Sequence, residues 1–100
     1  MSIEILVGLN VTDDAAYSTY RDGMTPILVV HDGSFGYDFK VAELLKSESD
    51  VPINRVFIIR FPDESAMSSF FSDSDYLKVK AAHFDRSVSD TVIIATYEPR

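Results

Sequence analysis

The side chains best suited to chemistry in this sequence are its two histidines and a group of tyrosines. Imidazole is the side chain whose ordinary pKa lies nearest to neutral pH, so His31 and His83 are the candidate catalytic bases. Tyr17 and Tyr20 are close enough in sequence for one helix to present both hydroxyls on the same face. If Tyr37 lies on a strand below them, these tyrosines and His83 would form a ligand-binding group for a small aromatic or carbonyl compound.

Each of these residues also has a purely structural interpretation. His31 can end a helix, where the negative end of the helix dipole favours an imidazolium. His83 can lie on a helix surface, near Asp85 or Asp90. The tyrosine rings can simply fill the core while their hydroxyls reach its rim. The residue pattern leaves both interpretations open.

The sequence contains none of the common catalytic signatures. It has no nucleophile elbow, P-loop, dinucleotide-binding fingerprint or zincin helix. The run Gly33-Ser34-Phe35-Gly36 is too short for a phosphate-binding loop. Asp73 and Asp75 lack the glycine and the terminal glutamate of a calcium loop. We therefore expect no metal site and no cofactor.

The hydrophobic pattern predicts the elements that position these residues. Apolar and polar residues alternate, as in strands, over 3–9, 35–41, 55–61 and 91–97. Helical spacing covers 16–31 and 66–84, and residues 43–54 are expected to form an exposed loop. Thr12 or Asp13 and Asp63 or Ser65 are the candidate N-caps. The order strand, helix, strand, strand, helix, strand is typical of an α+β ferredoxin-like βαββαβ fold, with a four-stranded antiparallel sheet and two helices on one face.

Irregularities are expected within the helices. Pro26 lacks an amide hydrogen and should kink or restart the first helix, and Gly33 should end that helix in the left-handed conformation. The run from Ser72 to Asp75 should break the second helix. One hundred residues fit a single domain spanning 1–100.

The two faces of the predicted sheet differ in composition. The bulkier set, expected under the helices, comprises Ile3, Ile5, Val7, Leu9, Phe35, Tyr37, Phe39, Phe57, Ile59 and Phe61. The opposite set mixes apolar and charged side chains: Leu6, Val56, Ile58, Glu4, Asp38, Lys40 and Arg60. Such a mixed face suits a dimer interface with internal ion pairs, so we expect a homodimer. A chain this short buries only about 60–65% of its unfolded surface, and a second subunit would add to that burial.

Several short motifs resemble the domain-of-unknown-function 1330 family. They are Asp13…Tyr17…Tyr20…Pro26, the strand end Phe61-Pro62-Asp63, and Ser72/Ser74…Tyr76, and the resemblance runs from about Ile3 to Tyr97. It implies a ferredoxin-like subunit of the dimeric α/β-barrel superfamily, whose sheet pairs with that of a partner. The chain departs from the family pattern at three places. Arg60 stands where the family usually has an acidic residue, His83 stands in place of an arginine, and Asp32-Gly33 stands in place of paired glycines.

Composition narrows the choice of partners and location. The formal net charge of −7 and the pI near 4.5 argue against nucleic acid and against an anionic membrane surface. The longest apolar runs, Ile27–Val30 and Val56–Ile59, are too short to cross a membrane. The first residues do not resemble a signal peptide, and the chain has no cysteine, so we expect a cytoplasmic protein.

Two classes of function follow from these observations. The first is a small-ligand-binding or interaction module without catalysis. The alternative is a cofactor-free oxygenase or isomerase acting on a small aromatic or carbonyl compound, with His83 or His31 as base and Tyr17 or Tyr20 as proton donor. A cavity above about 300 Å³ lined by His83 would favour the enzyme, whereas a filled core with His83 in solvent would favour the module.

Overall fold

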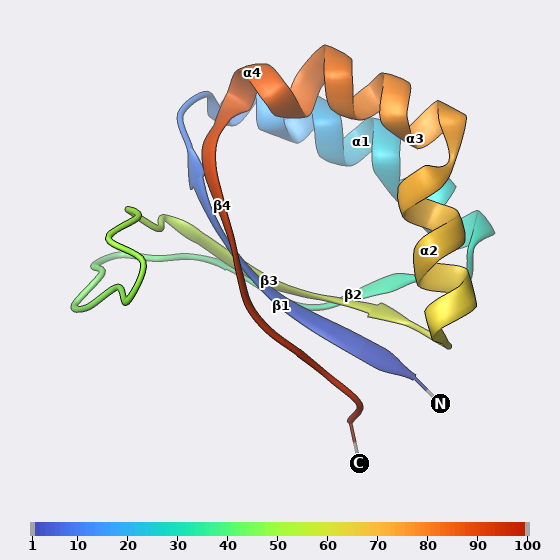
Figure 1. Ribbon diagram of the computed structural model, residues 1–100. Coiled ribbons are helices and arrows are strands. Elements are labelled where there is room, and N and C mark those ends of the chain that lie inside the picture. Colours follow the sequence, from blue (N-terminus) through green and yellow to red (C-terminus); the bar gives the residue numbers. More distant parts are fainter. Residues whose placement is uncertain (1, 100) are drawn as a thin grey trace.

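The computed structural model describes residues 2–99, which form a four-stranded sheet with helices over one face (Figure 1). The elements are β1 (Ile3–Val11), α1 (Asp14–Val30), β2 (Ser34–Lys40), β3 (Arg55–Phe61), α2 (Glu64–Ser72), α3 (Ser74–Val79), the π-helical turn η1 (Lys80–Phe84), α4 (Asp85–Ser87) and β4 (Val88–Tyr97). The strand order is β2-β3-β1-β4, and every neighbouring pair is antiparallel. This is the predicted βαββαβ arrangement.

Of the two candidate N-caps for each helix, Asp13 caps α1 and Asp63 caps α2. Asp13 accepts a hydrogen bond from the amide of Ala16 (3.0 Å), and Asp63 accepts one from the amide of Ala66 (2.7 Å). Each carboxylate satisfies an amide that has no partner within its own helix. The negative charge also lies at the positive end of the helix dipole.

Helix α1 differs from the sequence-based expectation at two points. It runs unbroken through Pro26, because Met24 and Leu28 on either side are buried in the core and hold both halves against it. The left-handed residue after the helix is Asp32 (φ 60°) rather than Gly33. Glycine is required at position 33 for space, since a Cβ there would lie 2.3 Å from Leu28 Cδ1.

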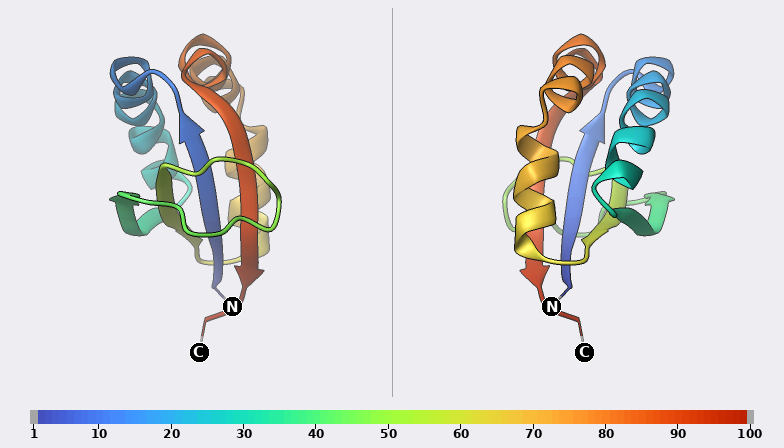
Figure 2. Two further views of the ribbon diagram at one scale, coloured as in Figure 1. Left: turned by 90° about the vertical axis from the view of Figure 1, so that its left-hand side faces the viewer. Right: turned by 90° about the vertical axis from the view of Figure 1, so that its right-hand side faces the viewer.

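The second helical region breaks at Asp73, as predicted. Asp73 caps α3 by accepting hydrogen bonds from the amides of Asp75 (2.8 Å) and Tyr76 (3.3 Å). Its other carboxylate oxygen accepts a bond from Nε2 of His31 (2.8 Å), the residue that ends α1. Asp73 therefore sets the direction of α3 and ties it to α1. The two helical segments lie side by side over the sheet (Figure 2).

The core lies between the sheet and this helical layer. Phe57, Phe61 and Phe70 are buried, and the rings of Phe61 and Phe70 are 5.6 Å apart. The other buried apolar members are Ile5, Val7, Leu9, Tyr17, Tyr20, Met24, Leu28, Ile59, Tyr76 and Val88. The predicted inner face is therefore confirmed for the central strands β1 and β3. No helix within residues 2–99 is both long and apolar enough to cross a membrane.

The predicted inner face is wrong for the second half of β2. Phe35 pairs with Ile59 and Asp38 pairs with Phe57, so two residues of β2 lie opposite the single residue Ile58. This β-bulge reverses the alternation of side chains. Tyr37 and Phe39, expected under the helices, are 73% and 52% exposed. Asp38, expected on the outer face, shares the face of Phe57 instead.

The opposite face of the sheet is open to solvent and carries a polar cluster centred on Glu4. Glu4 accepts hydrogen bonds from Arg60 Nε and from the hydroxyl of Tyr97 (3.0 Å). The hydrogen bond from Arg60 is the main reason that the pKa of Glu4 lies below its usual value. Glu4 is buried, so its charge is compensated within the chain.

Replacing Phe70 with alanine should remove the contact between α2 and the sheet and leave a cavity. We expect a loss of about 3–5 kcal/mol in the free energy of unfolding, measured by urea denaturation. Leu45→Ala is the control, because Leu45 is 87% exposed and its loss should cost less than about 0.5 kcal/mol. Equal effects of the two substitutions would contradict the core described above.

The Asp73 carboxylate should make folding sensitive to acid. Hydrogen bonds from His31 and from the amides of Asp75 and Tyr76 hold the pKa of Asp73 below its ordinary value of 3.8. A carboxyl group whose pKa is lowered by folding stabilises the fold above its unfolded-state pKa, and that stabilisation is lost as the pH falls through the folded-state pKa.

Urea denaturation between about pH 6 and pH 2 tests this sign. Asp73→Ala should be less stable than the parent at pH 6, and the difference should shrink as the pH falls below 3.8. Asp75→Asn leaves the pair of His31 and Asp73 intact and should keep the parental acid dependence. A constant difference between Asp73→Ala and the parent would disprove the linkage.

Candidate functional site

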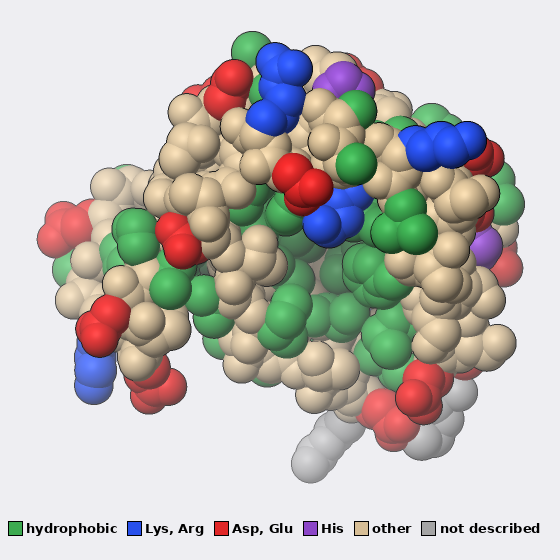
Figure 3. Space-filling view, turned by 45° about the horizontal axis from the view of Figure 1, so that its top comes forward, with side chains coloured by type: hydrophobic (Ala, Val, Ile, Leu, Met, Phe, Trp, Pro, Cys, Tyr) green, Lys and Arg blue, Asp and Glu red, His purple; other side chains and the backbone are tan. Residues whose placement is uncertain are grey.

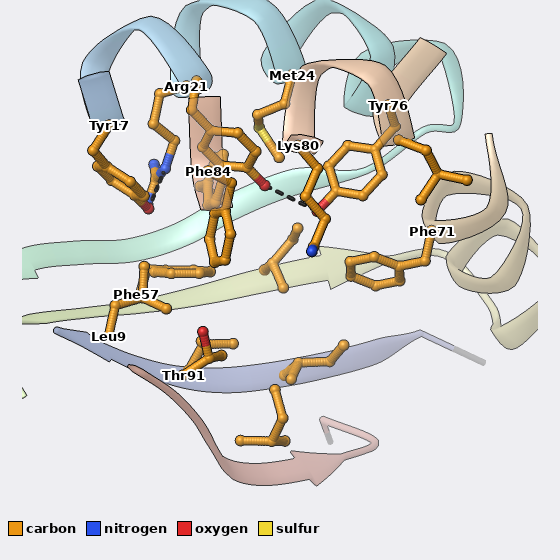
Figure 4. Close-up of a pocket in the computed structure, with 17 residues that line it drawn as sticks. Leu9, Tyr17, Arg21, Met24, Phe57, Phe71, Tyr76, Lys80, Phe84 and Thr91 are labelled. Carbon is orange, nitrogen blue, oxygen red and sulfur yellow. Dashed lines mark hydrogen bonds between the residues drawn. The ribbon is translucent and has the colours of Figure 1, made fainter. Parts of the chain in front are cut away.

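A cavity of about 430 Å³ lies between the sheet and the helices. Figure 3 shows the hollow from outside, with hydrophobic walls and both basic and acidic side chains near its rim. The lining residues come from all four strands, α1, α2, α3 and η1 (Figure 4): Ile5, Val7, Leu9, Tyr17, Tyr20, Arg21, Met24, Phe35, Phe57, Ile59, Phe71, Tyr76, Leu77, Lys80, Phe84, Thr91 and Ile93. Most of this lining is apolar, and much of it is aromatic.

Helical and strand periodicity explain how these side chains converge. Every second residue of β1, from Ile5 to Leu9, points toward the helices, as do Phe57 and Ile59 of β3. In α1, Tyr17, Tyr20 or Arg21, and Met24 recur about once per turn, so all face the sheet. In the second helical region Tyr76, Lys80 and Phe84 recur at intervals of four, with the last two in the π-helical turn η1.

Three tyrosine hydroxyls belong to the cavity wall. The hydroxyls of Tyr20 and Tyr76 are 3.0 Å apart, and the Tyr17 hydroxyl accepts a bond from Arg21 Nε (2.8 Å). Burial raises the pKa of all three tyrosines above the usual value of 10.0. All three hydroxyls therefore stay protonated at neutral pH and can donate hydrogen bonds.

Arg21 belongs to a charged cluster at one end of the cavity. Asp38 lies between two guanidinium groups, 3.1 Å from Arg21 and 2.8 Å from Arg55. Hydrogen bonding from Arg55, supported by Arg21, holds the pKa of Asp38 below its usual value. Arg21 also stacks on Phe35, with its Cζ atom 4.0 Å from the ring centroid. The Arg21 guanidinium is therefore already engaged by neighbours.

Lys80 is the other cationic residue in the lining. Its ammonium lies 3.0 Å from Asp85 Oδ1 and 5.4 Å from the centre of the Phe84 ring. In Figure 4 the Lys80 side chain extends down from the helices into the space above the sheet, beside Tyr76. A half-exposed ion pair of this kind contributes little to stability, so Lys80 can exchange its partner.

The structure brings together only part of the site predicted from the sequence. Tyr17 and Tyr20 both line the cavity, with ring centroids 5.6 Å apart. Tyr37 lies outside because of the β-bulge, and the half-buried His83 in η1 is also absent from the lining. His31 is engaged with Asp73 at the end of α1, also away from the cavity.

Sequence reasoning missed four polar residues of the lining: Arg21, Tyr76, Lys80 and Thr91. A signal was present, since Arg21 follows Tyr17 by one helical turn and Lys80 follows Tyr76 by one turn. Lysine and arginine at such positions usually lie on a solvated helix face, so spacing alone does not single them out. Among residues 2–99, no three His, Asp or Glu side chains are placed to share a metal ion.

Several solved structures are similar to this one. No curated protein matches the sequence. A protein of unknown function from Rhodopseudomonas palustris has a TM-score of 0.84 at 19% identity, covering 99% of this chain and 82% of that chain. A dimeric ferredoxin-like protein of unknown function from a Jannaschia species has a TM-score of 0.63 at 13% identity, covering 99% and 100%.

A third similar structure is SnoaB, a cofactor-independent oxygenase from Streptomyces nogalater. Its TM-score is 0.65 at 13% identity, with 99% of this chain and 93% of that chain covered. Together these likenesses show that the fold is ferredoxin-like, as the sequence pattern predicted. The model of the family described as "Domain of unknown function (DUF1330)" matches residues 5–97, and the chain therefore belongs to that family.

Proposed function

We propose that this protein binds a small, largely aromatic molecule carrying a hydrogen-bond acceptor, in the cavity between sheet and helices. The observation that carries the proposal is the cavity itself, with a volume of about 430 Å³, aromatic walls and a few polar groups. Small-ligand sites typically occupy about 300–1,000 Å³ and combine these features. The hydroxyls of Tyr17, Tyr20 and Tyr76 would orient the acceptor.

Binding accounts for this lining better than catalysis does. A cofactor-free oxygenase or isomerase, the alternative function, needs a group that removes a proton from its substrate. The candidate bases His31 and His83 are both outside the lining, and burial raises the pKa of the three lining tyrosines, which favours their protonated forms. The tyrosine hydroxyls of the lining are therefore proton donors, whereas the alternative enzyme function requires a proton acceptor.

Deleting hydroxyl groups one at a time tests the proposed site. Titration of the protein with 2-acetylnaphthalene, followed by calorimetry, should show binding that weakens in Tyr20→Phe and Tyr76→Phe. We expect a two- to tenfold rise in the dissociation constant, since one net hydrogen bond contributes about 0.5–1.5 kcal/mol. Tyr37→Phe is the matched control, because that hydroxyl lies outside the cavity.

Chemical-shift mapping locates the ligand independently of affinity. Resonances of residues that line the cavity should shift on titration, and those of the exposed loop at 43–54 should stay unchanged. Shifts confined to that loop, or absence of binding by the parent protein, would refute the proposed function.

We also propose that the chain forms a homodimer through the open face of its sheet. Leu6, Ile58, Phe39 and Ile94 gather there around the cluster of Glu4, Arg60 and Tyr97. Phe39 and Ile94 are 52% and 47% exposed, an unusual position for large apolar side chains on a sheet surface. Pairing two such sheets would make a dimeric α/β barrel, and the similar Jannaschia protein is described as dimeric.

The Ile94→Glu variant tests the dimer without disturbing the core. A charge in the middle of an apolar interface should shift the protein to a monomer at micromolar concentration, measured by size-exclusion chromatography with light scattering. Val30→Glu, at an exposed position at the end of α1, should remain dimeric like the parent. A monomeric parent protein would disprove the homodimer.

We further propose that the protein does not bind nucleic acid and that it is cytoplasmic. A net charge of −7 disfavours polyanionic partners such as nucleic acid, and the absence of cysteine agrees with a cytoplasmic location.

A further inference from the structure

We propose that the ligand of the cavity is a small aromatic carboxylate whose anionic group is held by Lys80. The inference rests on the proposed function and names the chemical class of the ligand. It depends on the distribution of charge around the cavity and on which of its polar groups remain available.

The charge of the lining is opposite to that of the protein. The chain has 16 acidic and 9 basic residues, yet among residues 2–99 only two charged residues, Arg21 and Lys80, line the cavity. All 16 acidic residues fall within the described residues 2–99, and none of them belongs to the lining. A cationic pocket in an acidic protein favours anionic ligands over cationic ones.

Arg21 and Lys80 differ in how many of their hydrogen-bond donors already have a partner within the protein. Arg21 donates to the Tyr17 hydroxyl and to both oxygens of Asp38, and it stacks on Phe35. Its side chain is 14% exposed, and its guanidinium shares Asp38 with that of Arg55. A hydrogen bond from Arg21 to a ligand would require breaking this cluster. Arg21 therefore lines the cavity in a fixed position and does not bind the carboxylate of the ligand.

Lys80 has a single, weakly held partner. Its side chain is 41% exposed and that of Asp85 is 55% exposed, so solvent screens their attraction. An ammonium group has three donors and can turn from Asp85 toward a carboxylate inside the cavity. The apolar walls there strengthen an ion pair relative to one in water.

The tyrosine pair supplies a second donor to the same ligand group. Only one proton lies between the hydroxyl oxygens of Tyr20 and Tyr76, which are 3.0 Å apart. The other hydroxyl proton is free to bond a carboxylate oxygen. Tyr76 and Lys80 are one helical turn apart and extend into the same part of the cavity (Figure 4). An ammonium and a hydroxyl donor therefore match the two oxygens of one carboxylate.

Titration calorimetry with 2-naphthoate and with its neutral analogue 2-naphthamide tests the inference. The parent protein should bind naphthoate about tenfold more tightly than naphthamide, as expected for a hydrogen bond between charged groups. Lys80→Met keeps the apolar stem and should remove this preference, so that naphthoate binding weakens about tenfold more than naphthamide binding. Lys80→Arg should restore most of the preference, because a cation is present again.

Two further variants separate the role of Lys80 from general effects of charge. Asp85→Asn removes the carboxylate that competes for Lys80, so it should tighten naphthoate binding about threefold, as for loss of a surface ion pair. Lys78→Met removes a neighbouring lysine that does not line the cavity and should leave both affinities unchanged. Thermal unfolding of each variant confirms that it is folded.

The outcomes distinguish the two proposals. Equal affinity of the parent for naphthoate and naphthamide, or a naphthoate preference that survives in Lys80→Met, overturns the carboxylate inference while the binding function stands. If the parent binds neither compound nor 2-acetylnaphthalene, the proposed function fails and the inference fails with it. Equal losses in Lys80→Met and Lys78→Met would assign the effect to net charge and would also overturn the inference.

Discussion

The cluster in which Asp38 is shared by Arg21 and Arg55 determines much of the remaining architecture. The carboxylate reaches the inner face only because β2 carries one extra residue opposite Ile58. Once there, it bonds a residue of α1 and a residue of β3, and so joins the helix to two strands. One carboxylate between two guanidinium groups compensates half of their charge, so the cluster keeps one net positive charge. The aromatic rings of Tyr17, Phe35 and Phe57 stack against Arg21 and keep its guanidinium in place.

A second contact holds the opposite end of the helical layer. Phe70 packs on Phe61 of the sheet and on Tyr76 of α3, with ring centroids 5.6 and 4.4 Å away. Asp73 turns the chain between α2 and α3 and binds His31 at the end of α1. The helices are thus fastened to the sheet at two separated places. Between these places the helices are not packed tightly onto β1 and β3, and the cavity occupies the space that remains.

This arrangement explains why the cavity has a distinct chemical character. Its walls come from residues that periodicity directs inward, so they are apolar and aromatic. Its polar groups are hydroxyls and cations, since the acidic residues lie on helix ends, in loops and on surfaces where caps and solvent stabilise them. Asp38 is the exception on the inner face, and it is neutralised by two arginines. A net negative protein can therefore present a donor-rich interior.

The sequence by itself determined the elements, their order and the inner face of the central strands. The recurrence of bulky apolar residues at every second position of β1 and β3 and the helical spacing of Tyr17, Tyr20 and Met24 are local patterns, and burial of one apolar face enforces them. Caps at Asp13, Asp63 and Asp73 are local for the same reason: each carboxylate bonds an amide two or three residues away.

Tertiary structure decided the register of the edge strand and the contents of the site. A β-bulge exists only relative to a paired strand, and the sequence of β2 alone does not reveal it. The alternation of residue types in β2 therefore predicted the wrong face for Tyr37. The π-helical turn and the neighbours of His83 depend on how η1 packs against α1. A cavity is a space between elements that are distant in sequence, and its volume depends on their separation. The position of the cavity shows that Lys80 lines it and that His83 does not. Lys80 is therefore the candidate for binding the ligand.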